Sequence, residues 1–306
     1  MTRVWLPDPP ETIEPLKNLP AGIEVDVWTG AGPLPDSRDE VEFIVPQLGI
    51  KPAALREISS LPSLKVIQLM SAGAEHIRPY IPANITLCNA RGAHDAATAE
   101  WTVGAIVAHL RNFPRFAIAQ EEQKWDFTPS ESVAGKRVLI VGYGSIGAAV
   151  ERRLAGWEVT IDRIARTARP GVKSIAELSD ALPHADVVVI LLPVTDETRH
   201  LVNAGFLSRM KDRALLVNAA RGAIVDTDAL LKELMSTRIK AALDVTEPEP
   251  LPKDHPLWQA PGLLLTPHVG GAVTEARVRA YRIVRDQLER YAAGEPLRNV
   301  IGSRGY

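Results

Sequence analysis

Three side chains that can handle protons and carboxylates follow apolar runs in the second half of the chain. Arg221 comes after LLVNAA, Asp244 ends the run KAALD, and His268 comes after LLLTP. Such runs are typical of strands in a parallel sheet, and ligands of open parallel sheets bind beyond the carboxyl ends of the strands. A histidine there can act as a general acid or base, and an arginine can bind a carboxylate through two parallel hydrogen bonds. The three residues therefore predict one site at one edge of a sheet.

Each of these residues also has an ordinary structural explanation. An arginine or aspartate in a loop is usually a solvated charge, and a single histidine is more often structural than catalytic. Of the seven histidines, however, only His268 combines a strand end with a Gly-Gly pair behind it. This combination favours a functional interpretation.

A glycine pattern, G-x-G-x-x-G, lies within VLIVGYGSIGAAV at Gly142, Gly144 and Gly147. It follows an apolar strand and opens a helix, which is the context in which the pattern predicts a dinucleotide site. Gly142 permits the tight turn, Gly144 lets the backbone approach a pyrophosphate, and Gly147 lets the helix pack on the strand. Ser145 and Ile146 begin the helix, whose N–H groups and partial positive charge favour phosphate.

The elements that must position these residues alternate along the chain. The strand-like segments are VWL, EVDVW, EFIVP, KVIQLM and ITLCN before Asn89, and RVLIVG, EVTIDRIA, DVVVILL, ALLVNA, KAALDV and LLLTP from Lys136 onwards. Strands alternating with helices predict an α/β fold with parallel sheets. The six later strands match the number in a full dinucleotide-binding sheet. Between them, SIAELSDAL predicts a helix opened by the capping pair Ser174 and Glu177.

Length and composition restrict the class of protein. With 306 residues the chain exceeds the usual size of one hydrophobic core, so we expect two domains. Apolar residues make up 46% and charged residues 24%, and the net charge of −2 gives no general attraction to nucleic acid or to an anionic membrane. Cys88 is the only cysteine, which excludes an intrachain disulfide and a thiolate metal cluster and suits a reducing cytoplasm. We therefore expect a cytoplasmic protein without a metal, and no apolar run approaches the roughly 20 residues of a membrane helix.

The motifs around the candidate residues resemble those of one family. NAARG at 218–222, ALDVTEPEPLP at 242–252 and TPHVGG at 266–271 look like three consecutive signatures of the D-isomer-specific 2-hydroxyacid dehydrogenases, and LMSAGAEHI at 69–77 looks like their substrate loop. The likeness covers essentially the whole chain and includes glyoxylate/hydroxypyruvate reductase-like and phosphoglycerate dehydrogenase-like members. Ala74-Glu75 and Trp101 depart from the pattern, which leaves the substrate's side chain open.

The resemblance implies an NAD(P)-dependent enzyme that interconverts a small 2-oxo acid and the D-2-hydroxy acid. His268 would be the general acid and base, and a neighbouring carboxylate would favour its imidazolium form. The family register selects Glu249 as that carboxylate, although TEPEP taken by itself offers Glu247 equally. A non-catalytic, NAD(P)-sensing protein related to corepressors is the alternative, and an amino-acid dehydrogenase would need a catalytic lysine that the motifs lack.

The same resemblance implies the remaining contacts. Arg221 would bind the substrate's carboxylate and carbonyl, and backbone N–H groups at Ala72 and Gly73 would hold the other side of the carboxylate. Besides the glycine pattern, the residues implied for the cofactor are Leu192, Pro193, Thr198, Ala219, Asp244, His268 and Gly270.

The family organisation also implies the domains. Residues 95–272 would form a doubly wound, parallel dinucleotide-binding domain, and residues 1–94 with 273–306 a smaller, flavodoxin-like substrate domain, so that both domains are Rossmann-like. Hinges are expected near Asn89–Thr98 and Gly270–Glu275. The resemblance also implies a homodimer, since relatives are typically homodimers joined through the nucleotide domain, and the segment from Phe113 to Phe127 is the expected contact.

The stretch IDRIARTAR bears on the choice of cofactor. Asp162 lies 20 residues after Gly142 and so meets the spacing of an acid that binds the ribose of NAD(H). If the strand continues to Ala165, however, Asp162 lies inside it, and Ala165 takes the place of the acid. Arg166 would then follow the strand and could bind the 2′-phosphate of NADP(H). We expect NADP(H), with NAD(H) as the alternative.

Overall fold

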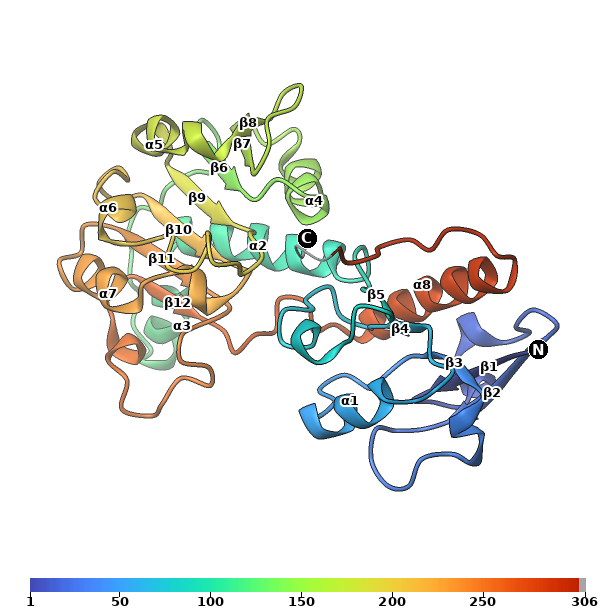
Figure 1. Cartoon of the computed structure of the whole chain (residues 1–306). Coiled ribbons are helices and arrows are strands. Elements are labelled where there is room, and N and C mark those ends of the chain that lie inside the picture. The colour runs from blue at the N-terminus through green and yellow to red at the C-terminus, as the bar shows by residue number, and fades with distance from the viewer. Residues whose placement is uncertain (303–306) are drawn as a thin grey trace. The chain divides into compact units, whose positions relative to one another are not determined.

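The computed structural model describes residues 1–302 as two compact units, each built around a parallel sheet of its own (Figure 1). Unit 1 comprises Met1–His94 together with the chain from Val273 onwards, and unit 2 comprises Asp95–Ala272. The predicted α/β class with two parallel sheets is confirmed. The ligand that each unit binds stays a prediction.

Unit 1 contains all five strands that the sequence predicted. Its sheet has the order β2-β1-β3-β4-β5, which is the flavodoxin-like order, and every neighbouring pair is parallel. The strands are β1 (Thr2–Leu6), β2 (Ile23–Val27), β3 (Val41–Ile44), β4 (Val66–Gln68) and β5 (Thr86–Cys88). The helices are α1 (Pro52–Ser59) and α8 (Thr274–Ala292), with the short 3-10 turns η1 (Pro10–Thr12), η2 (Glu14–Leu16), η3 (Asp36–Asp39) and η4 (Arg78–Tyr80).

The two helices of unit 1 pack in separate apolar clusters. Val4 of β1 packs in the cluster that contains Tyr281 of α8, whereas the next residue, Trp5, packs in the cluster that contains Leu55 of α1. Successive side chains of a strand point to opposite faces of a sheet, so the two helices cover opposite faces.

Unit 2 has a sheet of seven parallel strands in the order β12-β11-β10-β9-β6-β7-β8. The expectation of six strands was wrong, because β8 has only two residues and shows no periodicity in the sequence. The strands are β6 (Arg137–Val141), β7 (Thr160–Ala165), β8 (Lys173–Ser174), β9 (Val187–Ile190), β10 (Leu215–Asn218), β11 (Lys240–Leu243) and β12 (Leu263–Leu265). Numbered by their order within unit 2, β6, β7 and β8 are strands 1, 2 and 3, and β9, β10 and β11 are strands 4, 5 and 6. The sheet then has the 3-2-1-4-5-6 order of dinucleotide-binding sheets, with β12 added beyond strand 6.

Helices cover both faces of this sheet, which makes it doubly wound. Leu139 of β6 packs in the cluster formed with α5, α6 and α7, whereas Val138 and Ile140 pack in the cluster formed with α2 and α4. The helices are α2 (Asp95–Leu110), α3 (Phe113–Glu121), α4 (Ser145–Leu154), α5 (Leu178–Ala181), α6 (Ala204–Leu207) and α7 (Thr227–Met235). Short 3-10 turns are η5 (Ile175–Glu177), η6 (Leu182–His184), η7 (Gly222–Ile224) and η8 (Pro256–Gln259).

The helix expected for SIAELSDAL is broken into η5, α5 and η6. Its predicted capping pair is present, because the Glu177 carboxylate accepts the Ser174 N–H at 3.0 Å. Pro183 lies in η6 and has no N–H to extend α5, which accounts for the change of helix type.

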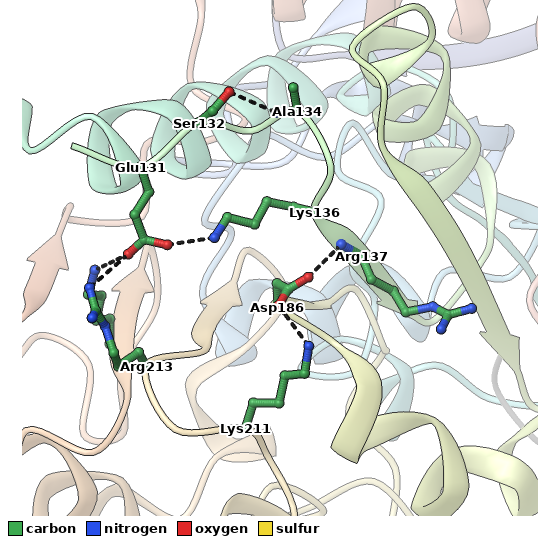
Figure 2. A network of polar contacts seen from close by, with 9 residues as sticks. Glu131, Ser132, Ala134, Lys136, Arg137, Asp186, Lys211 and Arg213 are labelled. Atoms are coloured by element: carbon green, nitrogen blue, oxygen red, sulfur yellow. Dashed lines mark hydrogen bonds and ion pairs between the residues drawn. The ribbon is translucent and has the colours of Figure 1, made fainter. Parts of the chain in front are cut away.

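Charged contacts gather at the amino ends of the strands of unit 2 (Figure 2). Glu131 accepts from Lys136 at 2.5 Å, Lys240 at 3.2 Å and Arg213 at 3.4 Å, and the hydrogen bond from Lys136 is the main cause that lowers the pKa of its carboxyl to about 2. His109 of α2 lies near this cluster, and burial lowers its pKa to about 4. Its Nδ1 is buried without a hydrogen-bond partner in the described chain.

A second carboxylate, Asp186, joins the starts of neighbouring strands in the same view (Figure 2). It accepts the N–H of Arg137 at 2.8 Å and the ammonium of Lys211 at 2.9 Å. These contacts anchor the amino ends of the strands and leave the opposite, carboxyl ends to the loops of the candidate site. Within residues 1–302 no helix is long and apolar enough to cross a membrane.

Candidate active site

Arg221, Asp244 and His268 follow three adjacent strands. β10, β11 and β12 are parallel neighbours, and Arg221, Asp244 and His268 come after their carboxyl ends in that order. The fold therefore brings the three loops that carry them to one edge of the unit 2 sheet.

His268 contacts a carboxylate through one ring nitrogen. Its Nδ1 lies 2.5 Å from Oε1 of Glu249, and both side chains remain partly open to solvent. The backbone of His268 has φ +56°, a left-handed conformation that is uncommon outside glycine, and its N–H donates to the carbonyl of Asp244 at 2.7 Å. Because Glu249 contacts Nδ1, the other nitrogen, Nε2, is the one that can serve a substrate.

Glu247, the other carboxylate of TEPEP, has different partners. Its Oε1 accepts from Arg199 at 3.0 Å and its Oε2 contacts His200 at 2.6 Å, while its carbonyl accepts the hydroxyl of Thr227 at 2.7 Å. The residues alone left Glu247 and Glu249 open, and the structure pairs Glu249 with the histidine.

Asp244 organises the loop that carries His268. It is buried, and its Oδ1 accepts the Thr266 hydroxyl at 2.6 Å and the Val269 N–H at 2.9 Å, while its Oδ2 accepts the Gly270 N–H at 2.8 Å. A side chain at Gly270 would begin 2.8 Å from Oδ2, so glycine is required for this contact. Thr266 was not singled out from the sequence, although it lies two residues before the histidine. The contact of Asp244 with a nicotinamide stays a prediction.

Arg221 is held by a buried amide that the sequence analysis gave no role. The Asn218 side chain donates to the Arg221 carbonyl at 2.9 Å and accepts the Ala220 N–H at 3.1 Å. A Cβ at Gly222 would lie 1.9 Å from the carbonyl oxygen of Thr246, so this turn is packed tightly against the loop after β11. The polar Asn218 at the end of an otherwise apolar run was the available signal.

The glycine turn fits a dinucleotide in its steric detail. Gly142 has φ +100°, and a Cβ there would lie 2.6 Å from the carbonyl group of Leu191. A Cβ at Gly147 would lie 3.2 Å from the side chain of Ile140, so the helix packs closely on β6. At Gly144, by contrast, nothing lies within 4 Å, and α4 begins with the next residue. The turn therefore leaves open space at a helix N-terminus, where a pyrophosphate binds in such folds.

The loop after β9 adjoins this turn through Leu191. Leu192 is buried, and the Thr198 hydroxyl donates to the Pro193 carbonyl at 2.6 Å and accepts the Thr195 N–H at 2.8 Å. Ala219, directly after β10, is partly buried. Thr198 thus fixes the shape of the loop, and its contact with a cofactor stays a prediction.

Strand β7 ends at Ala165, the residue on which the predicted preference for NADP(H) depends. It runs through Asp162 to Ala165, so the predicted strand end is confirmed. The Asp162 carboxylate lies 2.7 Å from Nε of Arg137 and is engaged inside the sheet. Arg166 follows the strand, is exposed, and has no polar partner within residues 1–302.

The two other arginines of this stretch have defined partners. Arg163 donates from Nε to Glu151 at 2.8 Å, and its charge is therefore balanced. Arg169 donates to the carbonyl of Tyr143, in the glycine turn, and its guanidinium lies 5.7 Å from the centre of that ring. The Tyr143 hydroxyl donates to Glu151 at 2.5 Å. A cation is thereby held at the glycine turn.

In unit 1, three carbonyl groups of the turn after β4 accept hydrogen bonds. The carbonyl of Ser71 accepts the Ala90 N–H at 2.8 Å, that of Ala72 accepts the Asn89 amide at 2.7 Å, and that of Gly73 accepts the Ser71 hydroxyl at 2.8 Å. In a trans peptide the N–H points opposite to the carbonyl of the preceding residue. The Gly73 N–H therefore points away from Asn89, and it donates to no group of the described chain, so it is available to a carboxylate.

The chain is similar to known proteins over most of its length. Residues 103–270 match the family model "D-isomer specific 2-hydroxyacid dehydrogenase, NAD binding domain". A glyoxylate reductase of Thermofilum pendens is 36% identical over 78% of this chain and 75% of its own length. A D-3-phosphoglycerate dehydrogenase of Methanocaldococcus jannaschii is 30% identical over 98% of this chain, which spans 59% of that relative.

Solved structures share the fold of the whole chain. An NADPH-dependent glyoxylate/hydroxypyruvate reductase from Sinorhizobium meliloti, in complex with NADP and sulfate, has a TM-score of 0.84 and 28% identity over 100% of both chains. An NAD-dependent formate dehydrogenase from Staphylococcus aureus, in complex with NAD, has a TM-score of 0.74 and 26% identity over 100% of both chains.

A doubly wound sheet with a glycine turn and a flavodoxin-like second sheet, shared with these relatives, define a two-domain, NAD(P)-dependent dehydrogenase. The chain belongs to the D-isomer specific 2-hydroxyacid dehydrogenase family, and it is an oxidoreductase of that family.

Proposed function

We propose that this protein reduces a small 2-oxo acid to the D-2-hydroxy acid with NADPH, and that His268, Glu249 and Arg221 carry out the reaction. The observation that supports this most is the 2.5 Å contact between His268 Nδ1 and Glu249 Oε1 at the carboxyl edge of the sheet. The glyoxylate reductases among this protein's relatives are consistent with this class of substrate.

The roles follow from the chemistry of these groups. The dinucleotide supplies a hydride to the carbonyl carbon when it is bound. Arg221 is proposed to bind the substrate carboxylate with its guanidinium fork. The Gly73 N–H of unit 1 is likewise proposed as a donor to a carboxylate. His268, oriented through Nδ1 by Glu249, gives the proton on Nε2 to the carbonyl oxygen and takes it back in the reverse reaction. Asp244 acts as a positioning residue, because it fixes the loop of the histidine.

The preference for NADPH rests on the end of β7. The acid that would bind the ribose hydroxyls is absent from the strand end, since Ala165 occupies that place and Asp162 is paired inside the sheet. Arg166 has an unpaired guanidinium in the described chain, and Arg169 is held beside the glycine turn. Two cations without a carboxylate favour a 2′-phosphate over a free hydroxyl.

We also propose that the protein is a homodimer. Four apolar side chains on and after α3 are exposed in the single chain, namely Phe113 (52%), Ile118 (58%), Trp125 (97%) and Phe127 (87%). Such a group of exposed apolar residues favours association. A molar mass near 33.3 kDa in light scattering at assay concentrations would contradict this proposal.

The proposed chemistry is tested by two matched carboxylate variants. Glu249→Gln should lower kcat for reduction of 2-oxo acids, whereas Glu247→Gln, which alters the carboxylate paired with Arg199 and His200, should have a much smaller effect. His268→Ala should lower kcat by about 10²–10⁴-fold, a far larger change than any change in the dissociation constant of NADPH. Tight binding of NADPH by the wild-type chain without turnover of any 2-oxo acid would favour the sensor alternative instead.

A further inference from the structure

A cavity of about 140 Å³ lies in unit 1 at the carboxyl ends of β3 and β4. Its walls are the residues that follow β3 and the turn that follows β4. The apolar part of the lining consists of Pro46, Leu48, Leu69, Met70 and Ile77. Its volume is close to that of an apolar cavity of about 150 Å³ that holds one benzene molecule. The cavity is thus large enough for a side chain of about six carbon atoms.

The charge of the lining restricts the ligand further. The polar residues are Gln47, Ser71 and His76, and within the described chain neither lysine nor arginine lines the cavity. A phosphate group carries charge that needs Arg or Lys partners when it leaves water. The cavity is therefore suited to a neutral, mainly apolar group, with hydrogen bonds available at its polar wall.

The position of Ser71 connects this cavity to the proposed carboxylate site. Ser71 lines the cavity, and its hydroxyl donates to the carbonyl of Gly73 at 2.8 Å, two residues further along the same turn. In a 2-oxo acid the side chain begins at the third carbon, only two bonds from the carboxylate carbon. A substrate whose carboxylate is bound by the Gly73 N–H can therefore place its side chain in the cavity.

We infer that this cavity binds the side chain of the substrate, and that the preferred substrates are 2-oxo acids with a neutral, mainly apolar side chain of three to six carbon atoms. This inference rests on the proposed function. Phosphorylated 2-oxo acids are poor substrates because, within the described chain, neither lysine nor arginine lines the cavity. Glyoxylate, which has no side chain, is a weak substrate because it leaves the cavity unfilled.

The test is a series of 2-oxo acids assayed with saturating NADPH. Each methylene buried in the cavity is worth about fourfold in binding. We expect kcat/KM for 4-methyl-2-oxopentanoate to exceed that for glyoxylate at least tenfold, and we expect 3-phosphohydroxypyruvate to be the poorest substrate.

Two variants of one lining residue test the cavity itself. Leu48 is 55% exposed, so its substitution is compatible with folding. Leu48→Trp should lower the ratio of kcat/KM for 4-methyl-2-oxopentanoate to that for glyoxylate at least tenfold, because the indole fills the space. Leu48→Arg should raise kcat/KM for 3-phosphohydroxypyruvate. Val27→Trp, at an exposed position of β2 that does not line the cavity, is the matched control. It should leave both the ratio and kcat/KM for 3-phosphohydroxypyruvate unchanged.

The outcomes separate the two proposals. If the wild-type chain reduces no 2-oxo acid with NADPH or NADH, the proposed function is wrong. If it reduces glyoxylate better than the longer acids, or if Leu48→Trp leaves the ratio unchanged, the proposed function stands and the cavity is not the side-chain site.

Discussion

Replacement of His109 by leucine should remove a pH dependence from the stability of unit 2. The ring lies in α2 near Glu131 and Lys240, and its Nδ1 is buried without a partner in the described chain. Burial is the largest cause that lowers the pKa of His109 from 6.5 to about 4, and the positive charge of Lys240 acts in the same direction. The folded chain therefore keeps this imidazole neutral at a pH where the unfolded chain protonates it.

The sign and size of the effect follow from this difference in pKa. Above pH 6.5 the imidazole is neutral in both states, so its contribution to stability is fully present there. As the pH falls from 6.5 to 4 the unfolded state binds a proton that the folded state does not, and the free energy of unfolding falls. At about 1.4 kcal/mol for each pH unit, the loss amounts to about 3 kcal/mol by pH 4. Glu131, whose pKa is lowered to about 2, loses its contribution only below pH 4.5 and therefore outside most of this window.

Urea unfolding of the wild-type chain and of His109→Leu, followed between pH 4.5 and 7.5, measures this contribution. The free energy of unfolding should fall more steeply with decreasing pH in the wild type, so that the curves of the two chains converge or cross toward pH 4.5. His184→Leu alters an exposed histidine of η6 and is the control; it should preserve the wild-type slope. Parallel curves for the wild type and His109→Leu would refute the argument.

Three further predictions concern the candidate site. Arg166→Ala should lower kcat/KM for NADPH by about 10–100-fold, because one or two charge-assisted hydrogen bonds to the 2′-phosphate are lost, and should leave kcat/KM for NADH unchanged. An equal effect on both cofactors, or any effect of the exposed control Arg209→Ala, would contradict the assignment of Arg166 to the phosphate. Arg221→Lys should raise KM for the 2-oxo acid and lower kcat, since an ammonium does not copy the guanidinium fork, and unchanged steady-state kinetics would exclude the role. Gly270→Ala places a methyl group 2.8 Å from the Asp244 carboxylate and should lower the free energy of unfolding by about 1–3 kcal/mol, measured as a lower Tm. An unchanged Tm would show that the loop can move to make room for the methyl group.

The parts of the fold that were predictable from the sequence carry their own local signal. Each strand of three or more residues contains apolar residues, either in a continuous run or alternating with polar ones, and the strand end at Ala165 followed from the expected length of its strand. The two residues of β8 were too few to show a period. Pairings such as Glu249 with His268, or Asp162 with Arg137, join residues that only the folded chain brings together. The residues themselves could not decide between the two carboxylates of TEPEP, and only the family register selected one.

The loops at the carboxyl edge of unit 2 are fixed largely by close backbone contacts between neighbouring loops. In three places a glycine lies so close to the loop after the adjacent strand that a side chain would collide with it; the pairs are Gly142 with Leu191, Gly222 with Thr246, and Gly270 with Asp244. The glycine turn after β6, the turn after β10 that carries Arg221 and the loop after β12 that carries His268 are thus each held against a neighbouring loop by contacts that leave no room for an extra atom. Cores that are packed in this way transmit a displacement instead of absorbing it. A substitution at any of the three glycines should therefore disturb the loop across from it as well as its own, and a loss of activity there would report on positioning of the site and not on lost contacts with the ligand.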